Sequence, residues 1–305
     1  MISVWTRRAA LALVCGSAVA VLAACGSSSV YRALKPTRLI SVGDGFADVG
    51  QSGYRFTIND GTLNWTQQLA ANYGLTLESS ATGGWSYAQG YAHVATPDTT
   101  SGTHAPSVQS QIDQVLARGA LTDTDLVLVG GGIADIVDAV NATGISAATT
   151  STVQAAGTAL GEQVIRLVNA GATHVVVAGV YDLGTSPWAR GLDQSKDQNG
   201  DITKLTDAYN AAIKLAIVKQ GANVLFVDPA LFFNLIYNGK YFNNPKDPVC
   251  TTPNVTTCTN DTLVAGADPT QYLFADGLYF TPTAQRMFAS DSYGQSAYAV
   301  LRDRW

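Results

Sequence analysis

The residues best placed to do chemistry lie in one short stretch near the start of the chain, "RLISVGDGFADVGQ", residues 38–51. The apolar run before Gly43 predicts a buried strand that ends in a tight turn at Asp44 and Gly45. An α/β enzyme often places its nucleophile on such a turn. Here the apex is Gly45, which has no side chain that could attack a substrate. Asp44 and Asp48 are candidates for acid and base catalysis, but we expect them to accept backbone hydrogen bonds that shape the turn.

Histidine is the usual proton acceptor in such sites, and the chain has three: His93, His104 and His174. His174 begins an apolar run, "HVVVAGV", at the end of the strand opposite the expected site, which favours a structural role. His104 lies in a polar segment, "TSGTHAPS", and is expected to be a solvated loop residue. His93 follows Ser86 by seven residues, a spacing more typical of loop neighbours than of a catalytic pair.

The elements that position these residues are strands that alternate with helices. Apolar runs predict strands at 38–43, 125–132, 174–184 and 223–229. Helical periodicity and stop signals predict helices at 62–75, 107–119, 151–169, 205–221 and 281–301. Right-handed crossovers then give a three-layer α/β/α fold with a parallel, flavodoxin-like sheet, in one domain over residues 38–305. The site of such a sheet lies beyond the carboxyl ends of its strands, which here means the loops 43–50, 82–90 and 130–135 and the segment before the last helix.

Composition excludes several classes of function. The chain has 305 residues, 47% of them hydrophobic and only 13% charged, with a formal net charge of −5. This composition supplies a sizeable core and argues against disorder. No basic stripe is present to hold a phosphate backbone, so we expect no nucleic-acid partner. We also expect no metal and no cofactor.

The amino-terminal segment predicts export and lipid attachment. Residues 1–24 combine Arg7 and Arg8 with an apolar stretch too short for a comfortable membrane span, as in a signal peptide. Leu22-Ala23-Ala24-Cys25 resembles the bacterial lipobox, which implies that Cys25 is lipidated. Gly26 follows in place of an aspartate, and the resemblance then implies an outer-membrane lipoprotein of the cell envelope. Residues 25–37 carry the lipidated cysteine and a short polar tether.

Two cysteines remain for the exported domain. Cys250 and Cys258 flank a loop rich in Thr, Pro and Asn, "CTTPNVTTC", and the compartment beyond an export signal is oxidising. A local disulfide is therefore expected, in preference to a reduced pair. A metal site is disfavoured because neither the spacing nor a neighbouring histidine supports one.

The expected site loops carry four segments in order: "VGDGFADVG", "ATGGWSYAQGYA", "LVLVGGGIADI" and "FADGLYFTPTA". They resemble four sequence blocks of the GDSL or SGNH ester hydrolases, a family of lipases, esterases and carbohydrate deacetylases. The resemblance implies the fold of that family over nearly the whole exported chain. It rests on Gly43, Asp44, Asp48, Gly50, Gly84, Gly132, Asp135, Asp276, Thr281 and Pro282.

The catalytic side chains of those blocks are missing. By the resemblance, Gly45 stands at the position of the nucleophilic serine, Ala134 at the oxyanion asparagine and Tyr279 at the catalytic histidine. Only Asp276 of the triad remains, with the backbone amides of Gly45 and Gly84 as implied oxyanion donors. Loss of nucleophile or base costs about 10⁶ in kcat in another serine hydrolase, and loss of one oxyanion donor a further 10² to 10³ or so. We therefore predict that this site does not perform Ser-His-Asp catalysis.

The prediction that follows is a catalytically inactive or very weak pseudo-esterase that keeps its pocket for binding. The pocket is expected to be lined by Asp44, Trp85, Ser86, Tyr87 and Tyr279 and to hold an acyl ester, lipid or glycan. One alternative is an active esterase or lipase that uses a compensating residue such as Ser86. A second alternative is a structural envelope lipoprotein whose cleft has no role.

Overall fold

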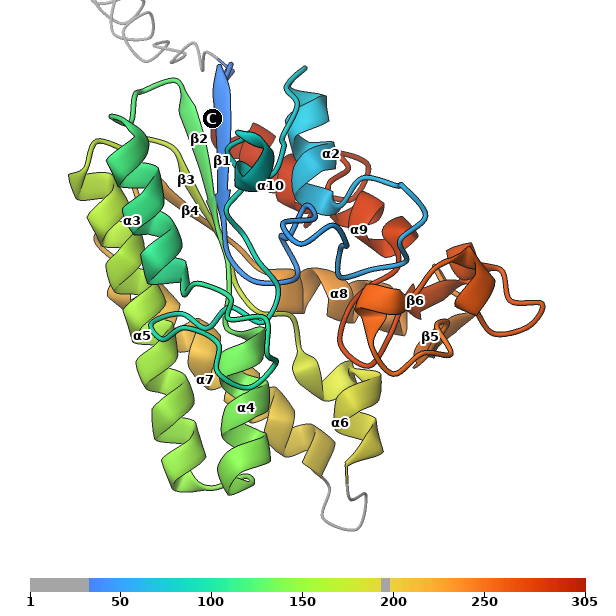
Figure 1. Cartoon of the computed structure of the whole chain (residues 1–305). Coiled ribbons are helices and arrows are strands. Elements are labelled where there is room, and N and C mark those ends of the chain that lie inside the picture. Colours follow the sequence, from blue (N-terminus) through green and yellow to red (C-terminus); the bar gives the residue numbers. More distant parts are fainter. Residues whose placement is uncertain (1–32, 193–197) are drawn as a thin grey trace, which may run out of the picture. The chain divides into compact units, whose positions relative to one another are not determined.

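A four-stranded parallel sheet forms the centre of the fold in the computed structural model, which describes residues 33–192 and 198–305. The strands are β1 (Arg38–Val42), β2 (Asp125–Val129), β3 (Val175–Ala178) and β4 (Val224–Val227), and they pair in that order. Every residue of β2 and β3 is buried, as expected for parallel strands covered on both faces. The α/β fold class predicted from the sequence is confirmed (Figure 1).

A short extended segment, residues 85–87, continues the sheet beyond β1. Ser86 forms a parallel bridge with Ser41, and the Ser41 amide donates to the Trp85 carbonyl at 3.0 Å. The Tyr87 amide in turn donates to the Ser41 carbonyl at 2.7 Å. In chain order this segment is the second strand, so the spatial order becomes 2-1-3-4-5, which is the flavodoxin-like order.

Helices cover both faces of the sheet. In Figure 1, α3 (Val108–Arg118), α5 (Ala147–Asn169) and α7 (Gln198–Ala216) lie on one face, with α4 (Ile133–Thr143) beside the lower part of α5. On the other face lie α2 (Trp65–Asn72), α8 (Pro229–Asn238), α9 (Pro282–Phe288) and α10 (Ala297–Arg304). The short α6 (Pro187–Gly191) and the paired strands β5 (Asn244–Pro248) and β6 (Tyr272–Phe274) lie beyond the carboxyl ends of the central strands.

The start of α4 depends on a glycine directly after β2. Gly132 has φ +112°, a left-handed conformation that favours glycine. A Cβ at this position would lie 2.2 Å from the ring of Tyr209 in α7, so a larger residue has no room. The Ile133 amide then donates to the Asp44 carboxylate at 3.1 Å. Together these contacts hold the first turn of α4 next to the turn that follows β1.

Aromatic side chains pack under the turn that follows β1 and hold it in place. Phe46 is buried and stacks on Trp65 of α2 with ring centroids 5.5 Å apart. It also packs edge-on against Phe280 at 5.9 Å. Phe280 in turn stacks on Phe233 of α8 at 3.7 Å. The backbone around Gly45 and the backbone around Tyr279 therefore share one rigid aromatic core.

The sequence prediction was wrong about several helical segments. The last helix predicted over 281–301 is split into α9 and α10 by residues 289–296. Serines account for the break, because the Ser296 side chain bonds the Ser290 carbonyl and also caps α10 by accepting from the Ala299 amide at 3.3 Å. Helix α4 was not predicted, and only its first residues, 133–135, fell in an expected loop; α6 and α8 were not predicted either.

The predicted signal peptide, Cys25 and most of the tether lie outside the described residues. Residues 34–304 group together as one unit of the chain. None of the helices in the described ranges is long and apolar enough to cross a membrane.

Candidate functional site

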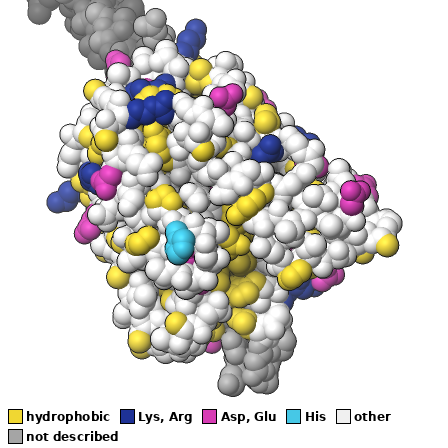
Figure 2. All heavy atoms as spheres, viewed as in Figure 1, with side chains coloured by type: hydrophobic (Ala, Val, Ile, Leu, Met, Phe, Trp, Pro, Cys, Tyr) yellow, Lys and Arg dark blue, Asp and Glu magenta, His cyan; other side chains and the backbone are white. Residues whose placement is uncertain are grey.

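A cavity of about 450 Å³ opens beyond the carboxyl ends of the central strands. Its walls come from the first turns of α4, the loop that contains Tyr91, the disulfide loop and the turn at 276–279. Figure 2 shows a band of hydrophobic side chains running down the middle of this face, with Lys and Arg toward its margins. The lining residues are Tyr91, Thr100, Ser101, Ile133, Ala134, Val137, Asp138, Pro253, Asn254, Val255, Asp276, Leu278 and Tyr279.

Tyr279 occupies the space that a side chain at position 45 would need. A Cβ built on Gly45 would lie 2.8 Å from the Tyr279 hydroxyl oxygen and 2.8 Å from Cγ of Phe56. The Tyr279 ring packs edge-on against Phe56 with centroids 4.9 Å apart, so it is held in this place. The space beside Gly45, where the resemblance predicted a nucleophile, is thus filled by the side chains of Tyr279 and Phe56.

Tyr279 cannot replace the missing base. Its side chain is buried, and this burial raises the pKa of the phenol well above its ordinary value. Nearby Asp44 and Asp276 raise the same pKa further, because a phenolate would be repelled by their carboxylates. The hydroxyl therefore stays protonated at neutral pH, where it can donate a hydrogen bond but cannot accept a proton from a substrate.

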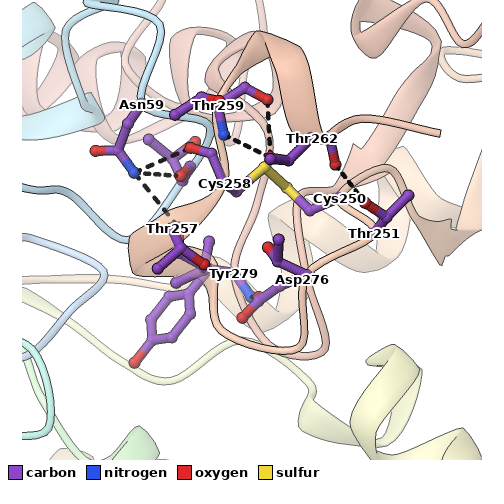
Figure 3. Close-up of a disulfide and its surroundings, with 12 residues drawn as sticks. Asn59, Cys250, Thr251, Thr257, Cys258, Thr259, Thr262, Asp276 and Tyr279 are labelled. Carbon is purple, nitrogen blue, oxygen red and sulfur yellow. Dashed lines mark hydrogen bonds between the residues drawn. A yellow bond between two sulfur atoms is a disulfide. The ribbon is translucent and has the colours of Figure 1, made fainter. Parts of the chain in front are cut away.

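Asp276, the expected triad acid, lines the cavity, and no described histidine lines it. Its Oδ1 accepts hydrogen bonds from the amides of Leu278, at 2.9 Å, and Tyr279, at 2.6 Å. Burial raises the pKa of Asp276 to about 6, although these two hydrogen bonds act in the opposite direction. No hydrogen bond from any described residue reaches Oδ2. Figure 3 shows Asp276 and Tyr279 beside each other, below the disulfide loop.

Asp44 and Asp48 shape the backbone around Gly45, as their positions in the turn predict. Asp44 accepts from the amides of Phe46, at 3.1 Å, and Ile133, at 3.1 Å. Asp48 accepts from Gly50, Gln51 and Gly90, at 2.8, 2.9 and 2.9 Å. Burial raises the pKa of Asp44 to about 6 and also raises the pKa of Asp48. Asp44 is not among the residues that line the cavity at Tyr279, since its oxygens accept from backbone amides; it lines a separate small hollow beside Phe46.

The predicted oxyanion amides behave differently from each other. The Gly84 amide donates to the Ser79 carbonyl at 2.8 Å, so it is not free to bind an oxyanion, and this part of the prediction was wrong. The reason is local: residues 79–84 form a tight turn at the sheet edge, and a Cβ at Gly84 would lie 2.1 Å from the Glu78 carbonyl oxygen. No hydrogen bond among the described residues uses the Gly45 amide. One of the two predicted donors therefore remains available.

Trp85, Ser86 and Tyr87 do not line the cavity, which corrects the predicted pocket. They form the extended edge segment, in which successive side chains point to opposite sides of the sheet. The Trp85 ring lies between the guanidinium groups of Arg38 and Arg118, 4.3 and 3.9 Å from the ring centroid. Arg118 also donates to the Tyr87 hydroxyl at 3.2 Å, which places both aromatic side chains toward α3.

No described residue forms a hydrogen bond with the Ser86 hydroxyl. The Ser86 side chain is fully buried. His93 is bonded elsewhere: its Nε2 lies 3.1 Å from Oδ2 of Asp138 in α4. Thr100 donates to the same Asp138 oxygen at 2.9 Å. The structure thus supplies no serine–histidine pair at this position, and His93 instead ties the loop to α4.

Asp135, the acid of the third sequence block, also has a structural role. Both of its carboxylate oxygens accept from the Val94 amide, at 3.3 and 3.1 Å. Burial raises the pKa of Asp135 to about 6, although nearby His93 lowers it. Asp135 and Asp138 therefore anchor the 91–101 loop to α4, and this loop supplies Tyr91 to the cavity.

The predicted disulfide between Cys250 and Cys258 is confirmed. Its loop supplies Pro253, Asn254 and Val255 to the cavity wall. Asn59, from a distant part of the chain, holds this loop in place (Figure 3). Its backbone amide donates to the Cys258 carbonyl at 2.9 Å, and its side-chain Nδ2 donates to the same oxygen at 3.3 Å. The disulfide is thus part of the site's architecture, which the sequence did not indicate.

Sequence reasoning missed several residues that build the cavity. Tyr91 lies on the wall with φ +66°, in the left-handed region, directly after Gly90. A Cβ at Gly90 would lie 1.7 Å from the Phe56 ring, so this glycine is required for the close approach of the loop. Phe56 touches both Tyr91 and Tyr279 with ring centroids 5.2 and 4.9 Å away. Only the pair Gly90-Tyr91 carried a local signal, since a glycine often marks such a turn.

No family model matches the chain, and none of the curated proteins matches it. Among solved structures, it is similar to a member of the lipolytic protein G-D-S-L family from Veillonella parvula, with 10% identity and a TM-score of 0.43 over 83% of this chain and 93% of that one. It is similar to a carbohydrate acetylesterase from Sinorhizobium meliloti, with 13% identity and a TM-score of 0.43 over 88% and 97%. An extracellular lipase from Streptomyces rimosus gives 18% identity and a TM-score of 0.45 over 88% and 100%. At these low values, the functional inference rests on the chain's own residues.

Proposed function

We propose that this protein is a catalytically silent relative of the GDSL or SGNH ester hydrolases that binds a neutral acyl ester or glycan in its cleft without cleaving it. One observation carries the proposal: the Tyr279 hydroxyl lies 2.8 Å from where the Cβ of residue 45 would be. A site that had only lost its serine would leave that space open. Here a bulky residue fills it, while the cavity beside it stays open.

The remaining groups suit binding better than hydrolysis. The cavity offers hydrogen-bond groups on Thr100, Asn254 and Asp276 beside an apolar wall that includes Val137 and Leu278. A volume of about 450 Å³ lies within the range of small-ligand sites. Ser-His-Asp hydrolysis would need a histidine at the cavity, and no described histidine lines it.

We further propose that the protein is an outer-membrane lipoprotein of the bacterial cell envelope, anchored through Cys25. The lipobox-like segment before Cys25 and the polar residues after it support this proposal. The confirmed disulfide is consistent with an oxidising compartment. A lipid anchor would keep the cleft close to a bilayer, where envelope glycans and acylated molecules are abundant.

Hydrolysis by the purified protein tests the silent site. Native protein is compared with Gly45→Ser/Ala134→Asn/Tyr279→His and with a matched Gly45→Ala/Ala134→Asn/Tyr279→His protein, which has the same Cβ but no hydroxyl. We expect no turnover of short-chain p-nitrophenyl esters and no fluorophosphonate labelling by the native and matched proteins. Labelling of the serine variant alone supports an ester-hydrolase scaffold without its chemistry. Turnover by the native protein that fluorophosphonate abolishes contradicts the proposal and favours an active esterase.

Binding is tested separately by thermal unfolding with neutral esters and oligosaccharides. Ala134 lines the cavity, so Ala134→Trp should fill it and abolish any ligand-induced rise in Tm. Ala142→Trp is the matched control, because Ala142 is exposed on the same helix. If no neutral ligand stabilises the native protein, the binding role is wrong and a purely structural envelope lipoprotein is favoured.

A further inference from the structure

A second hollow adjoins the cavity and shares part of its wall. This groove has a volume of about 750 Å³ and lies between α6 and the disulfide loop. Asp276 and Pro253 line both the cavity and the groove, so the two hollows meet at these residues. The groove is otherwise lined by Trp188, Leu192, Asp247, Thr251, Thr252 and Gly277, among others.

The groove is firmly coupled to the turn that carries Asp276 and Tyr279. The Trp188 amide donates to the Gly277 carbonyl at 2.8 Å, which fixes the start of α6 against this turn. A Cβ at Gly277 would lie 3.7 Å from the Cβ of Trp188, an ordinary van der Waals contact. Trp188 is only partly buried and lines the groove, so part of its ring is available to a ligand.

We propose that cavity and groove form one extended cleft for a neutral oligosaccharide, with one sugar unit at Asp276 and Tyr279 and further units along the groove over Trp188. This inference rests on the proposed binding function of the cavity and adds the ligand class and a second subsite.

Charge excludes anionic ligands from the cavity. The carboxylates of Asp138 and Asp276 line it, and no Lys or Arg is among the residues of its wall. A fatty acid, a phosphate or an acidic sugar would place its negative charge beside these groups, with no cation there to offset the repulsion. In the groove, the guanidinium of Arg190 lies 3.7 Å from the Asp247 carboxylate, so its positive charge already faces a negative one.

The surface chemistry matches a sugar ring. One face of a pyranose presents C–H groups, which pack on aromatic rings, and its edge presents hydroxyl groups. The cleft supplies Tyr91 and Trp188, both only partly buried, as aromatic surfaces. It supplies Asn254, Thr251 and Asp276 as hydrogen-bond partners, and the unused Oδ2 of Asp276 is an acceptor for a ligand hydroxyl or amide.

The extended shape favours an oligomer over a single sugar or a short ester. A ligand confined to the cavity would leave the groove and Trp188 without a role. The groove wall is mixed, with Asp247, Thr251 and Thr252 beside apolar residues such as Trp188 and Leu192. An acyl chain would cover those three polar side chains without bonding them, whereas a sugar chain can bond them and still pack on the apolar part. A chain of sugars, with apolar faces and polar edges along its whole length, fits both hollows.

Calorimetry with the full-length protein tests the proposal, with N-acetylglucosamine and its hexamer, and glucose and cellohexaose, as probes. We expect at least one hexamer to bind roughly tenfold or more tightly than its monomer. Trp188→Ala should raise the Kd of that hexamer about tenfold and leave the monomer unchanged, whereas Trp188→Phe should retain most of the affinity. Tyr241→Ala is the control, because Tyr241 is 51% exposed and lines neither hollow. Thermal unfolding of each variant establishes that it is folded.

The outcomes separate this inference from the function on which it rests. Equal affinity for monomer and hexamer, or no effect of Trp188→Ala on a folded variant, overturns the extended cleft. Binding of a neutral p-nitrophenyl ester that Ala134→Trp abolishes, without binding of any saccharide, overturns the ligand class and leaves the proposed function intact. Binding of palmitate in preference to the saccharides also overturns it, since the charge argument would then be wrong. Absence of binding by every probe overturns both proposals.

Discussion

We expect Gly45→Ser to destabilise the folded protein, although serine is the residue that ester hydrolysis at this position needs. The new Cβ would lie 2.8 Å from the Tyr279 hydroxyl oxygen, 2.8 Å from Cγ of Phe56 and 2.9 Å from its Cδ1. Ordinary van der Waals contacts of a Cβ lie at 3.4–4 Å, so the neighbouring rings must move. Both rings are packed against each other, and neither is a flexible chain end.

The size of the effect follows from two opposing contributions. Overpacking of a well-packed site costs about 1 to 3 kcal/mol. Gly45 does not have a left-handed φ, so a serine adopts its backbone conformation without strain, and the loss of glycine's freedom in the unfolded chain returns about 0.4 to 1 kcal/mol. From the middle of the two ranges, about 2 and about 0.7 kcal/mol, the expected net decrease in the free energy of unfolding is about 1.3 kcal/mol.

Urea unfolding of a double-mutant cycle isolates the contact with the hydroxyl. The cycle compares native protein, Gly45→Ser, Tyr279→Phe and the double variant. Tyr279→Phe removes the hydroxyl oxygen, so the double variant should be more stable than the sum of the single effects by at least about 0.5 kcal/mol. Gly221→Ser is the control, since a Cβ there meets nothing within 4 Å. A Gly45→Ser protein as stable as the native one, or strict additivity in the cycle, would refute the view that Tyr279 fills the nucleophile's position.

Three further predictions concern the walls of the site. Replacing Cys250 and Cys258 by serine should lower the free energy of unfolding by about 2 to 3 kcal/mol, measured in urea. It should also weaken ligand binding at the cavity, and unchanged binding would contradict the role of the disulfide loop as a cavity wall. Because folding raises the pKa of Asp276 from 3.8 to about 6, the folded protein binds this proton more tightly than the unfolded chain does. The free energy of unfolding therefore falls as the pH rises between these two values, and the whole loss is present above the folded pKa. Asp276→Asn should therefore raise the free energy of unfolding at pH 8 by about 1 to 3 kcal/mol but hardly at pH 4, and an equal gain at both pH values would disprove the linkage. Ser86→Ala should leave the free energy of unfolding unchanged or raise it by up to about 1 kcal/mol, measured by thermal unfolding, because the buried Ser86 Oγ has no hydrogen-bond partner. If the native protein showed esterase activity and this variant lost it, Ser86 would be identified as a nucleophile.

The sequence by itself predicted the elements and the missing chemistry. Apolar runs located the four central strands, because a parallel strand covered on both faces must be apolar along its length. Residue identity alone shows that Gly45 has no hydroxyl and that Ala134 has no amide. The short separation of Cys250 and Cys258 favoured the disulfide, since bringing together two residues so close in sequence costs little loop-closure entropy.

Sequence patterns located only part of the cavity wall, namely Ala134, Asp276 and Tyr279. Trp85 and Tyr87 lie in a segment that resembles a site block, yet they face Arg118 and the side of α3, because the sheet edge decides which way alternate side chains point. Tyr91 and the disulfide loop line the cavity instead. Their approach depends on Gly90 and on Asn59, whose contacts join segments far apart in the chain.

The position of the Tyr279 hydroxyl is the clearest case of what only the tertiary structure decided. The resemblance predicted that a phenol, Tyr279, stands where the related enzymes have an imidazole, and hence that the base is absent. It did not determine that this phenol lies in the place of the missing nucleophile. That position follows from the packing of the ring on Phe56, which depends on the mutual arrangement of three separate loops rather than on any local pattern.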